Sequence, residues 1–146
     1  MSDLDFSVIL PAPRERLMEL ATDFENFPKY IPHQLKSVVV LEKNEKETTT
    51  LETIEFSSYL KTSFEQKTIH RWVSEHEIES DIVSGPAKGT KISMIFEKLD
   101  NDTKVSVFIQ LKLNLKTKFL LPIIKKWYKR IILSILYKMN ALIMNE

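Results

Sequence analysis

The sequence contains no cysteine and only two glycines in 146 residues. The lack of cysteine excludes a disulfide framework, a thiolate metal site and a cysteine nucleophile, and it is compatible with a reducing compartment. Long apolar runs are also missing, because the basic stretch at residues 125–130 interrupts the apolar C-terminal segment before it could span a membrane. The first five residues carry two aspartates and no signal region. These features predict a cytoplasmic protein that is at most peripheral to a membrane.

Motifs of common catalytic sites are absent as well. The sequence has no HExxH, phosphate loop, GxGxxG or GxSxG. Glu52 and Glu55 fall on opposite faces of an expected strand, which argues against a carboxylate pair. We therefore predict no catalytic residue, no metal site and no cofactor.

Histidine is the remaining candidate for acid–base chemistry. The sequence has three: His33, His70 and His76. His70 shares strand parity with Phe64 and Trp72, so it could point into a cavity and exchange a proton near neutral pH. A lone strand histidine is more often a structural or surface residue, and that interpretation stays open.

The length and composition fit one globular domain over residues 1–146, with 43% hydrophobic and 28% charged residues. The net charge of +1 hides an asymmetry. Residues 1–111 carry 13 Lys and Arg against 19 Asp and Glu, whereas residues 112–146 carry 8 against Glu146 alone. The basic segment either meets something anionic or complements the acidic part of the chain.

Periodicity and turn residues predict the order of elements. The expected strands span 4–10, 38–41, 48–58, 63–73, 77–83, 91–99 and 104–116. A short helix over 12–22 and one or two turns within 23–32 follow the first strand, and a long helix over 117–145 ends the chain. Sequential strands with short turns indicate an antiparallel sheet with one buried face.

Two of these elements have the clearest patterns. Residues 104–116 alternate six times, with Val105, Leu113 and Leu115 among the apolar positions. The long helix would measure roughly 42 Å from residue 118 to 145, with Pro122 in its first turn or at a kink. Its expected apolar face consists of Leu121, Ile124, Tyr128, Ile131, Ile135, Met139 and Leu142.

Three segments carry a family resemblance. They are residues 8–13 (VILPAP) leading into 17–20, residues 23–32 (DFENFPKYIP) and residues 85–90 (GPAKGT). Together they resemble the START-like superfamily, also called SRPBCC or helix-grip proteins, and within it the coenzyme Q-binding and polyketide cyclase-like branch. The resemblance implies an α+β fold, in which a curved antiparallel sheet of about seven strands wraps around a long C-terminal helix. The unusually apolar and basic last helix departs from that branch.

A curved sheet around one helix leaves a wedge that side chains need not fill, and such apolar concavities bind small molecules. A fatty acyl chain, an isoprenoid quinone or a polycyclic aromatic would suit it. The candidate lining residues are Phe27, Tyr30, Ile31, Phe64, Trp72, Met94, Phe96, Ile109, Leu111, Leu113, Tyr128, Ile131 and Ile135. Each of them could equally be plain core.

The outer face of the last helix is a second candidate site. It combines Leu133 and Tyr137 with Lys126, Lys129 and Arg130, a pattern that suits a membrane surface or a protein partner. Isolated exposed apolar residues are also common on soluble proteins. The chain lacks a global basic excess, so nucleic acid is an unlikely partner. The resemblance leaves one exception, because the same branch includes ribosome-associated members.

Three functions follow from these patterns together with the resemblance to the START-like superfamily. The first is noncatalytic binding or transport of a lipid or isoprenoid quinone, and the second is an interaction module, such as a ribosome-associated one, that uses the basic last helix. The third is an enzyme of the polyketide cyclase or dehydratase kind, with His70 or Tyr30 as its acid–base group.

Overall fold

Seven antiparallel strands form one sheet within residues 2–56 and 63–146, which are the residues that this computed structural model describes. The sheet order is β1-β7-β6-β5-β4-β3-β2. The strands are β1 (Ser2–Leu10), β2 (Leu35–Lys43), β3 (Glu47–Glu55), β4 (Ser63–Ser74), β5 (Glu77–Ile82), β6 (Lys91–Leu99) and β7 (Asp102–Leu111). The helices are α1 (Arg14–Ala21), the short 3-10 helices η1 (Phe24–Lys29) and η2 (Lys118–Leu120), and α2 (Leu121–Met144).

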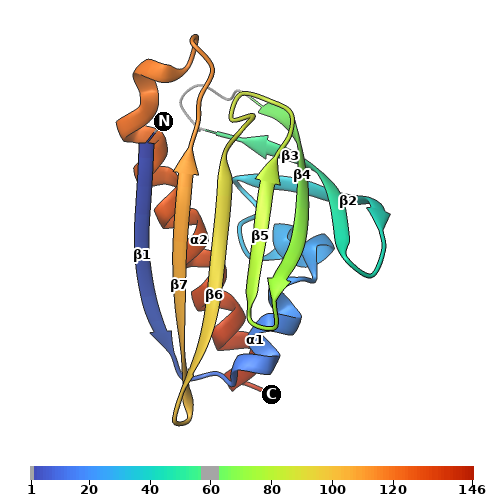
Figure 1. Cartoon of the computed structure of the whole chain (residues 1–146), viewed down its shortest axis with the longest axis vertical. Helices are drawn as coiled ribbons and strands as arrows, with labels where there is room; N and C mark the ends of the chain where they lie inside the picture. Colours follow the sequence, from blue (N-terminus) through green and yellow to red (C-terminus); the bar gives the residue numbers. More distant parts are fainter. Residues whose placement is uncertain (1, 57–62) are drawn as a thin grey trace.

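The long helix α2 lies along one face of the sheet, and the sheet curls so that β2 and β3 run steeply across the direction of β1 and β7 (Figure 1). The inward residues of β7 are almost completely buried, and they belong to one core cluster with Leu136 and Met139 of α2. The prediction of a curved sheet gripping a C-terminal helix is therefore confirmed.

Strand β7 ends at Leu111, so the expected strand over 104–116 is five residues too long. Its neighbour β6 begins at Lys91, opposite Gln110, and offers no pairing partner beyond that point. The chain instead turns at Asn114, whose side chain accepts a hydrogen bond from the Thr117 backbone at 3.0 Å. The alternation of apolar and polar residues thus continues to residue 116, although the hydrogen-bonded strand ends at Leu111.

Helix α2 begins at Leu121 rather than at residue 117, and its 24 residues measure roughly 36 Å. Pro122 lies in the first turn, where its missing N–H costs nothing. The expected apolar face is wrong at its C-terminal end, because Leu142 is exposed and Ile143 is buried. There α2 packs against α1, with the Asn140 side chain accepting a hydrogen bond from the Ala12 backbone at 2.9 Å, so the buried arc rotates around the helix.

The other boundaries differ by a few residues. Strand β2 is longer than the expected run at 38–41. Strand β3 ends at Glu55, and Ser57 and Ser58 of the expected strand over 48–58 lie outside the described residues. The aromatic segment forms η1, which contains Pro28.

Both glycines of the chain lie in the turn between β5 and β6, with positive φ angles of 93° at Gly85 and 98° at Gly89. A Cβ atom at Gly85 would lie 3.0 Å from the backbone oxygen of Glu65, whereas one at Gly89 would meet the flexible side chain of Lys112. The turn therefore requires glycine more strictly at its first position.

We expect Gly85→Ala to lower the free energy of unfolding by about 1–3 kcal/mol, because the substitution adds backbone strain and a contact that cannot relax. Gly89→Ala, the matched control, should cost less, since the Lys112 side chain can move away. Urea unfolding of both variants tests the order. A larger loss for Gly89→Ala would contradict this account of the turn.

Candidate functional site

Three apolar hollows lie between α2 and the sheet in the described part of the chain. The lower cavity has a volume of about 140 Å³ and lies toward the C-terminal end of α2, where Met139 lines it. The middle cavity, about 130 Å³, is lined by Ile31 and Ile131. The upper cavity, about 170 Å³, is lined by Phe64 and Leu120. Tyr128 lines all three, so they follow one another along the helix.

The hollows lie where the sheet curls away from the straight helix. On the sheet side, the lower cavity is lined by β3, β4, β5 and the start of β6, and the middle cavity by β2, β3, β4 and Ile92 of β6. On the other half of the sheet, Val105 and Val107 of β7 are completely buried in the core. The helix thus contacts one half of the sheet closely and bridges the other half.

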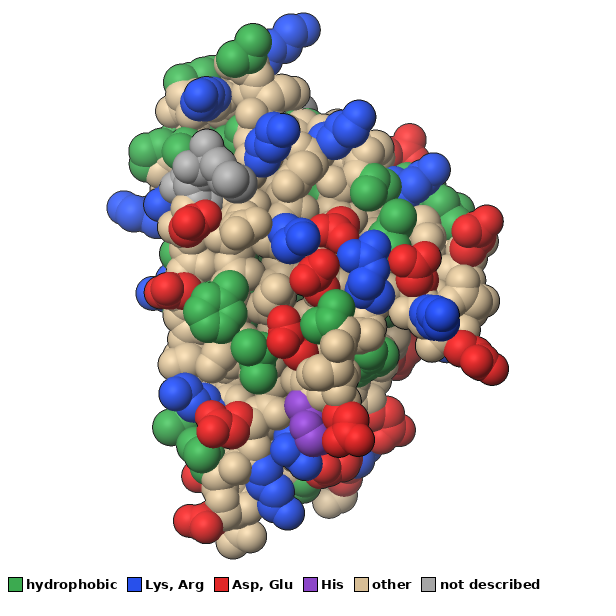
Figure 2. All heavy atoms as spheres, viewed as in Figure 1, with side chains coloured by type: hydrophobic (Ala, Val, Ile, Leu, Met, Phe, Trp, Pro, Cys, Tyr) green, Lys and Arg blue, Asp and Glu red, His purple; other side chains and the backbone are tan. Residues whose placement is uncertain are grey.

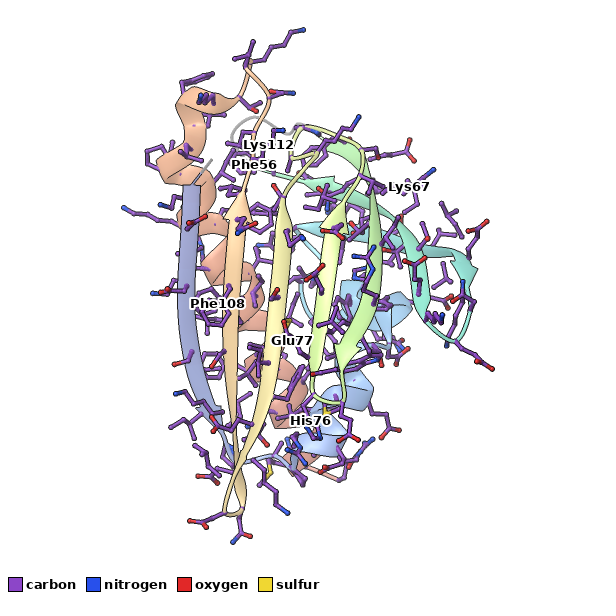
Figure 3. The ribbon with its side chains drawn as sticks, viewed as in Figure 1. Phe56, Lys67, His76, Glu77, Phe108 and Lys112 are labelled. Carbon is purple, nitrogen blue, oxygen red and sulfur yellow. The ribbon has the colours of Figure 1, made fainter. Side chains whose placement is uncertain are left out.

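Part of the sheet side of the lower and middle cavities is polar and is called the polar wall here. Inward positions of three neighbouring strands supply Thr50, Glu52, Gln66, Thr68, His70 and Ser80. Glu52 pairs with Gln66 across β3 and β4, and His70 pairs with Ser80 across β4 and β5. The residues between them, such as Lys67, are on the opposite face of the sheet, which Figure 3 views. A small group of polar side chains therefore faces an otherwise apolar space.

His70 is held as a neutral imidazole within this wall. Its ring stacks on Phe24 with centroids 3.9 Å apart. Nε2 lies 2.9 Å from the Thr50 hydroxyl, and Nδ1 lies 2.7 Å from the Ser80 hydroxyl. Burial lowers the pKa of His70 to about 3. Since both ring nitrogens already have partners, His70 organises the wall and has no free nitrogen for a ligand.

Glu52, unlike His70, has a polar atom without a hydrogen-bond partner in the described residues. Burial raises the pKa of its carboxyl to about 7, although hydrogen bonds, first that from Thr68, oppose the shift. Its Oε1 accepts a hydrogen bond from the Thr68 hydroxyl at 2.6 Å. Within the described residues, Glu52 Oε2 and Gln66 Oε1 are buried without a partner. Buried polar atoms nearly always have partners, so this pair marks where a ligand or water would bind.

Tyr128 contributes the only hydroxyl that α2 adds to these three linings. Burial raises the pKa of this phenol, and the negative charge of Glu52 raises it further. The phenol therefore stays protonated and can donate a hydrogen bond at any physiological pH.

Eight of the sequence-predicted lining residues lie along the cavities. Phe27, Met94, Tyr128 and Ile135 line the lower one, Ile31 and Ile131 the middle one, and Phe64 and Leu113 the upper one. Ligand contact by these residues remains a prediction.

The other five lie elsewhere. Phe96, Ile109 and Leu111 fill the core on the densely packed half of the sheet. Tyr30, expected at the mouth of the cavity, is only 7% exposed, and its carbonyl accepts a hydrogen bond from Lys138 of α2. Trp72 is 39% exposed because it lies at the end of β4, next to the turn into β5. None of the five lines these three cavities.

The sequence pointed to one residue of the polar wall, His70, which lines the lower and middle cavities as its strand parity suggested. Glu52 and Gln66 were not proposed as site residues, although parity was a usable signal. Glu52 shares its strand face with Ile54, and Gln66 shares its face with Phe64. What the sequence could not show was that β3 and β4 pair in the register that places the two opposite each other.

The predicted outer surface of α2 is partly engaged with the rest of the chain. Lys126, Arg130 and Tyr137 are exposed, whereas Leu133 is half-buried. The Lys129 ammonium lies 5.8 Å from the centre of the Phe6 ring of β1. No helix in the described ranges has both the length and the apolarity needed to span a bilayer.

Comparisons with known proteins agree with this architecture. A family model described as polyketide cyclase / dehydrase and lipid transport matches residues 10–139. No curated protein sequence matches the chain significantly.

Solved structures similar to this one share its fold. A protein from Thermus thermophilus has a TM-score of 0.83 at 16% identity, over 99% of this chain and 98% of its own. The Zhui aromatase/cyclase from Streptomyces sp. R1128 has a TM-score of 0.82 at 10% identity, over 94% and 93%. A START superfamily protein from Mycobacterium smegmatis reaches 0.79 at 15% identity, over 98% and 97%.

We expect Glu52→Gln to stabilise the protein increasingly as the pH rises. The folded-state pKa of about 7 lies above the ordinary 4.5, so ionising Glu52 costs folding free energy between these values. The variant should gain nothing below pH 4.5 and up to about 3 kcal/mol above pH 7. Urea unfolding across this range measures the gain.

Glu55→Gln is the matched control, because Glu55 lies on the same strand in an ion pair with Lys36 at 3.3 Å. It should show no comparable rise with pH. A stability difference for Glu52→Gln that does not change with pH would contradict the inferred burial of this carboxyl.

Proposed function

This chain belongs to the polyketide cyclase/dehydrase and lipid transport family, and we propose that it binds a hydrophobic small molecule, a lipid or an isoprenoid quinone, without transforming it. The observation that carries the proposal is the combination of an apolar cavity system and a short polar wall, in which Glu52 and Gln66 have unpartnered oxygens. Apolar lining with a few convergent polar groups is the usual composition of a small-molecule site.

The cavity volumes favour a ligand with ring-sized parts. An apolar cavity of about 150 Å³ accommodates a benzene molecule, and the lower and middle cavities are each near that size, at about 140 and 130 Å³. These two share Phe27, Tyr128 and Ile135 in their linings. A ring system would therefore occupy the polar half of the cavities when Tyr128 and its neighbours adjust.

The upper cavity suits an aliphatic tail. Its lining is almost entirely apolar, and it adjoins the middle cavity at Trp127 and Tyr128. A molecule with a ring at the polar wall and a tail beyond Trp127 would use all three cavities. Glu52 can accept a hydrogen bond from a hydroxyl when ionised and donate one to a carbonyl when protonated, so the wall can bind either a quinol or a quinone.

One observation favours a second candidate, an enzyme of the cyclase or dehydratase kind. A carboxyl with a pKa of about 7 can both take up and release a proton near neutral pH. Such a group in a cavity is what proton abstraction next to a ketone, or loss of a β-hydroxyl, would need. In this case Glu52 would be the acid–base group, because Tyr30 lies outside the cavities and both nitrogens of His70 are engaged.

We expect Ile135→Trp to weaken binding of a short-tailed ubiquinone by about tenfold or more, because the indole would occupy space shared by the lower and middle cavities. Displacement of a fluorescent naphthalene probe measures the affinity. Leu142→Trp is the matched control, since Leu142 is an exposed residue of the same helix. The smaller Ile135→Phe serves if the first variant folds poorly.

Equal affinities of wild type and Ile135→Trp would contradict binding in these cavities. Absence of wild-type binding to ubiquinone and to a medium-chain fatty acid would contradict the proposed function itself.

The second candidate is tested with a β-hydroxy ketone that carries an aromatic ring. If the protein is a noncatalytic binder, we expect the compound to lose water at the same low rate in the presence of wild type and of Glu52→Gln. A wild-type rate that exceeds that of Glu52→Gln by about a hundredfold would instead establish an enzyme, since this is a typical contribution of a general acid or base. Mass spectrometry of the mixture detects the loss of water.

A further inference from the structure

The segment between β7 and the first turn of α2 forms a protruding tip, defined here as residues 112–123. It carries three large exposed side chains: Leu115 is 89% exposed, Phe119 78% and Ile123 57%. In Figure 1 the segment rises above the end of the sheet and then turns into α2. Apolar side chains so fully exposed and so close in sequence are a common mark of an interaction site.

The tip is a formed structure held by hydrogen bonds. The Asn114 backbone donates to the Pro86 carbonyl at 3.1 Å, which ties the tip to the turn between β5 and β6. The Asn114 side chain accepts from the backbone and the hydroxyl of Thr117, at 3.0 and 2.7 Å. Leu115 and Lys116 occupy the middle of this turn, and both are exposed.

The charge of the tip has one sign. Lys112, Lys116 and Lys118 line one surface depression together with apolar neighbours that include Leu115. The sequence has no Asp or Glu from residue 112 to residue 145, and none of the ion pairs formed within the described ranges uses these three lysines. Figure 2 shows hydrophobic and basic side chains together at this end of the molecule, with acidic ones further from it.

We propose that the tip docks on the surface of a bilayer that contains anionic lipid. Leu115, Phe119 and Ile123 would enter the boundary between headgroups and acyl chains, and the lysines would face the lipid phosphates. The tip projects beyond the end of the sheet (Figure 1), and a fluid bilayer can accommodate such a projection without a complementary groove. Because the tip itself contains no carboxylate, nothing in it would repel an anionic surface.

The position of the upper cavity connects this surface to the proposed function. Leu113, Thr117 and Leu120 of the tip line that cavity on their inner side. Phe56 also lines this cavity, and Figure 3 shows it at the same end of the molecule as Lys112 of the tip. A ligand could thus pass between the bilayer and the cavities through the tip. This route rests on the proposed function, whereas docking does not.

The test is co-sedimentation of the full chain with phosphatidylcholine vesicles, with and without phosphatidylglycerol. We expect wild type to bind the anionic vesicles and to be released by salt. Joint replacement by Leu115→Ser, Phe119→Ser and Ile123→Ser should weaken binding by at least about tenfold. Lys116→Glu with Lys118→Glu should weaken it about tenfold and remove the salt dependence.

Two control variants locate the surface. Ile9→Ser with Phe108→Ser removes exposed apolar side chains from the outer face of the sheet, and it should leave vesicle binding unchanged. Arg130→Glu with Tyr137→Ser alters the outer face of α2 and should change binding less than about twofold. Circular dichroism confirms that each variant is folded.

Absence of wild-type binding to anionic vesicles would overturn the proposal. So would retained binding by the tip variants, or a loss of binding confined to the Arg130 and Tyr137 variant. Ubiquinone affinity measured without vesicles should be the same in the tip variants as in wild type. A failure of docking is thereby separated from a failure of ligand binding.

Discussion

A straight helix cannot follow a curved sheet along its whole width, and the rest of the structure depends on this mismatch. Helix α2 packs closely on the half of the sheet that contains β7, where the inward side chains are fully buried. Across β3, β4 and β5 the sheet curls away, and three cavities remain along the helix. Filling them would require larger side chains at inward positions of these strands that hold threonine or serine, such as Thr50, Thr68 and Ser80.

The polar wall is stable because most of its side chains hydrogen-bond to one another. The exceptions in the described residues are one oxygen of Glu52 and one of Gln66. His70 stays neutral between two hydroxyls, so its contribution to stability is present above pH 6.5 and is lost as the pH falls toward 3. Glu52 acts in the opposite direction, since its ionisation between pH 4.5 and 7 opposes folding. The chain retains an acid whose burial is costly; Glu52 pairs across the strands with Gln66, and in the described residues each has one buried oxygen without a partner.

The proposed ligand site and the proposed docking surface meet in the C-terminal quarter of the chain. The same segment that ends β7 lines the upper cavity on its inner side and exposes apolar and basic side chains on its outer side. In the sequence this charge asymmetry allowed two interpretations, an anionic partner or complementarity to the acidic part of the chain. The tip lysines favour the first, because none of them pairs with a carboxylate in the described residues.

The sequence by itself determined the order of elements and the antiparallel sheet, because alternation in strands, helical periodicity and turn residues are local properties of the chain. The wrapping of the sheet around the last helix was predicted from the resemblance of three sequence segments to the START-like superfamily. It also predicted part of the apolar lining, such as Ile131 and Ile135 of α2. Only the tertiary structure decided that Glu52 faces Gln66 inside a cavity, that Tyr30 is core, and that Leu115 is exposed. These outcomes depend on strand register, on the direction of sheet curvature and on where neighbouring strands end, and each involves residues far apart in the chain.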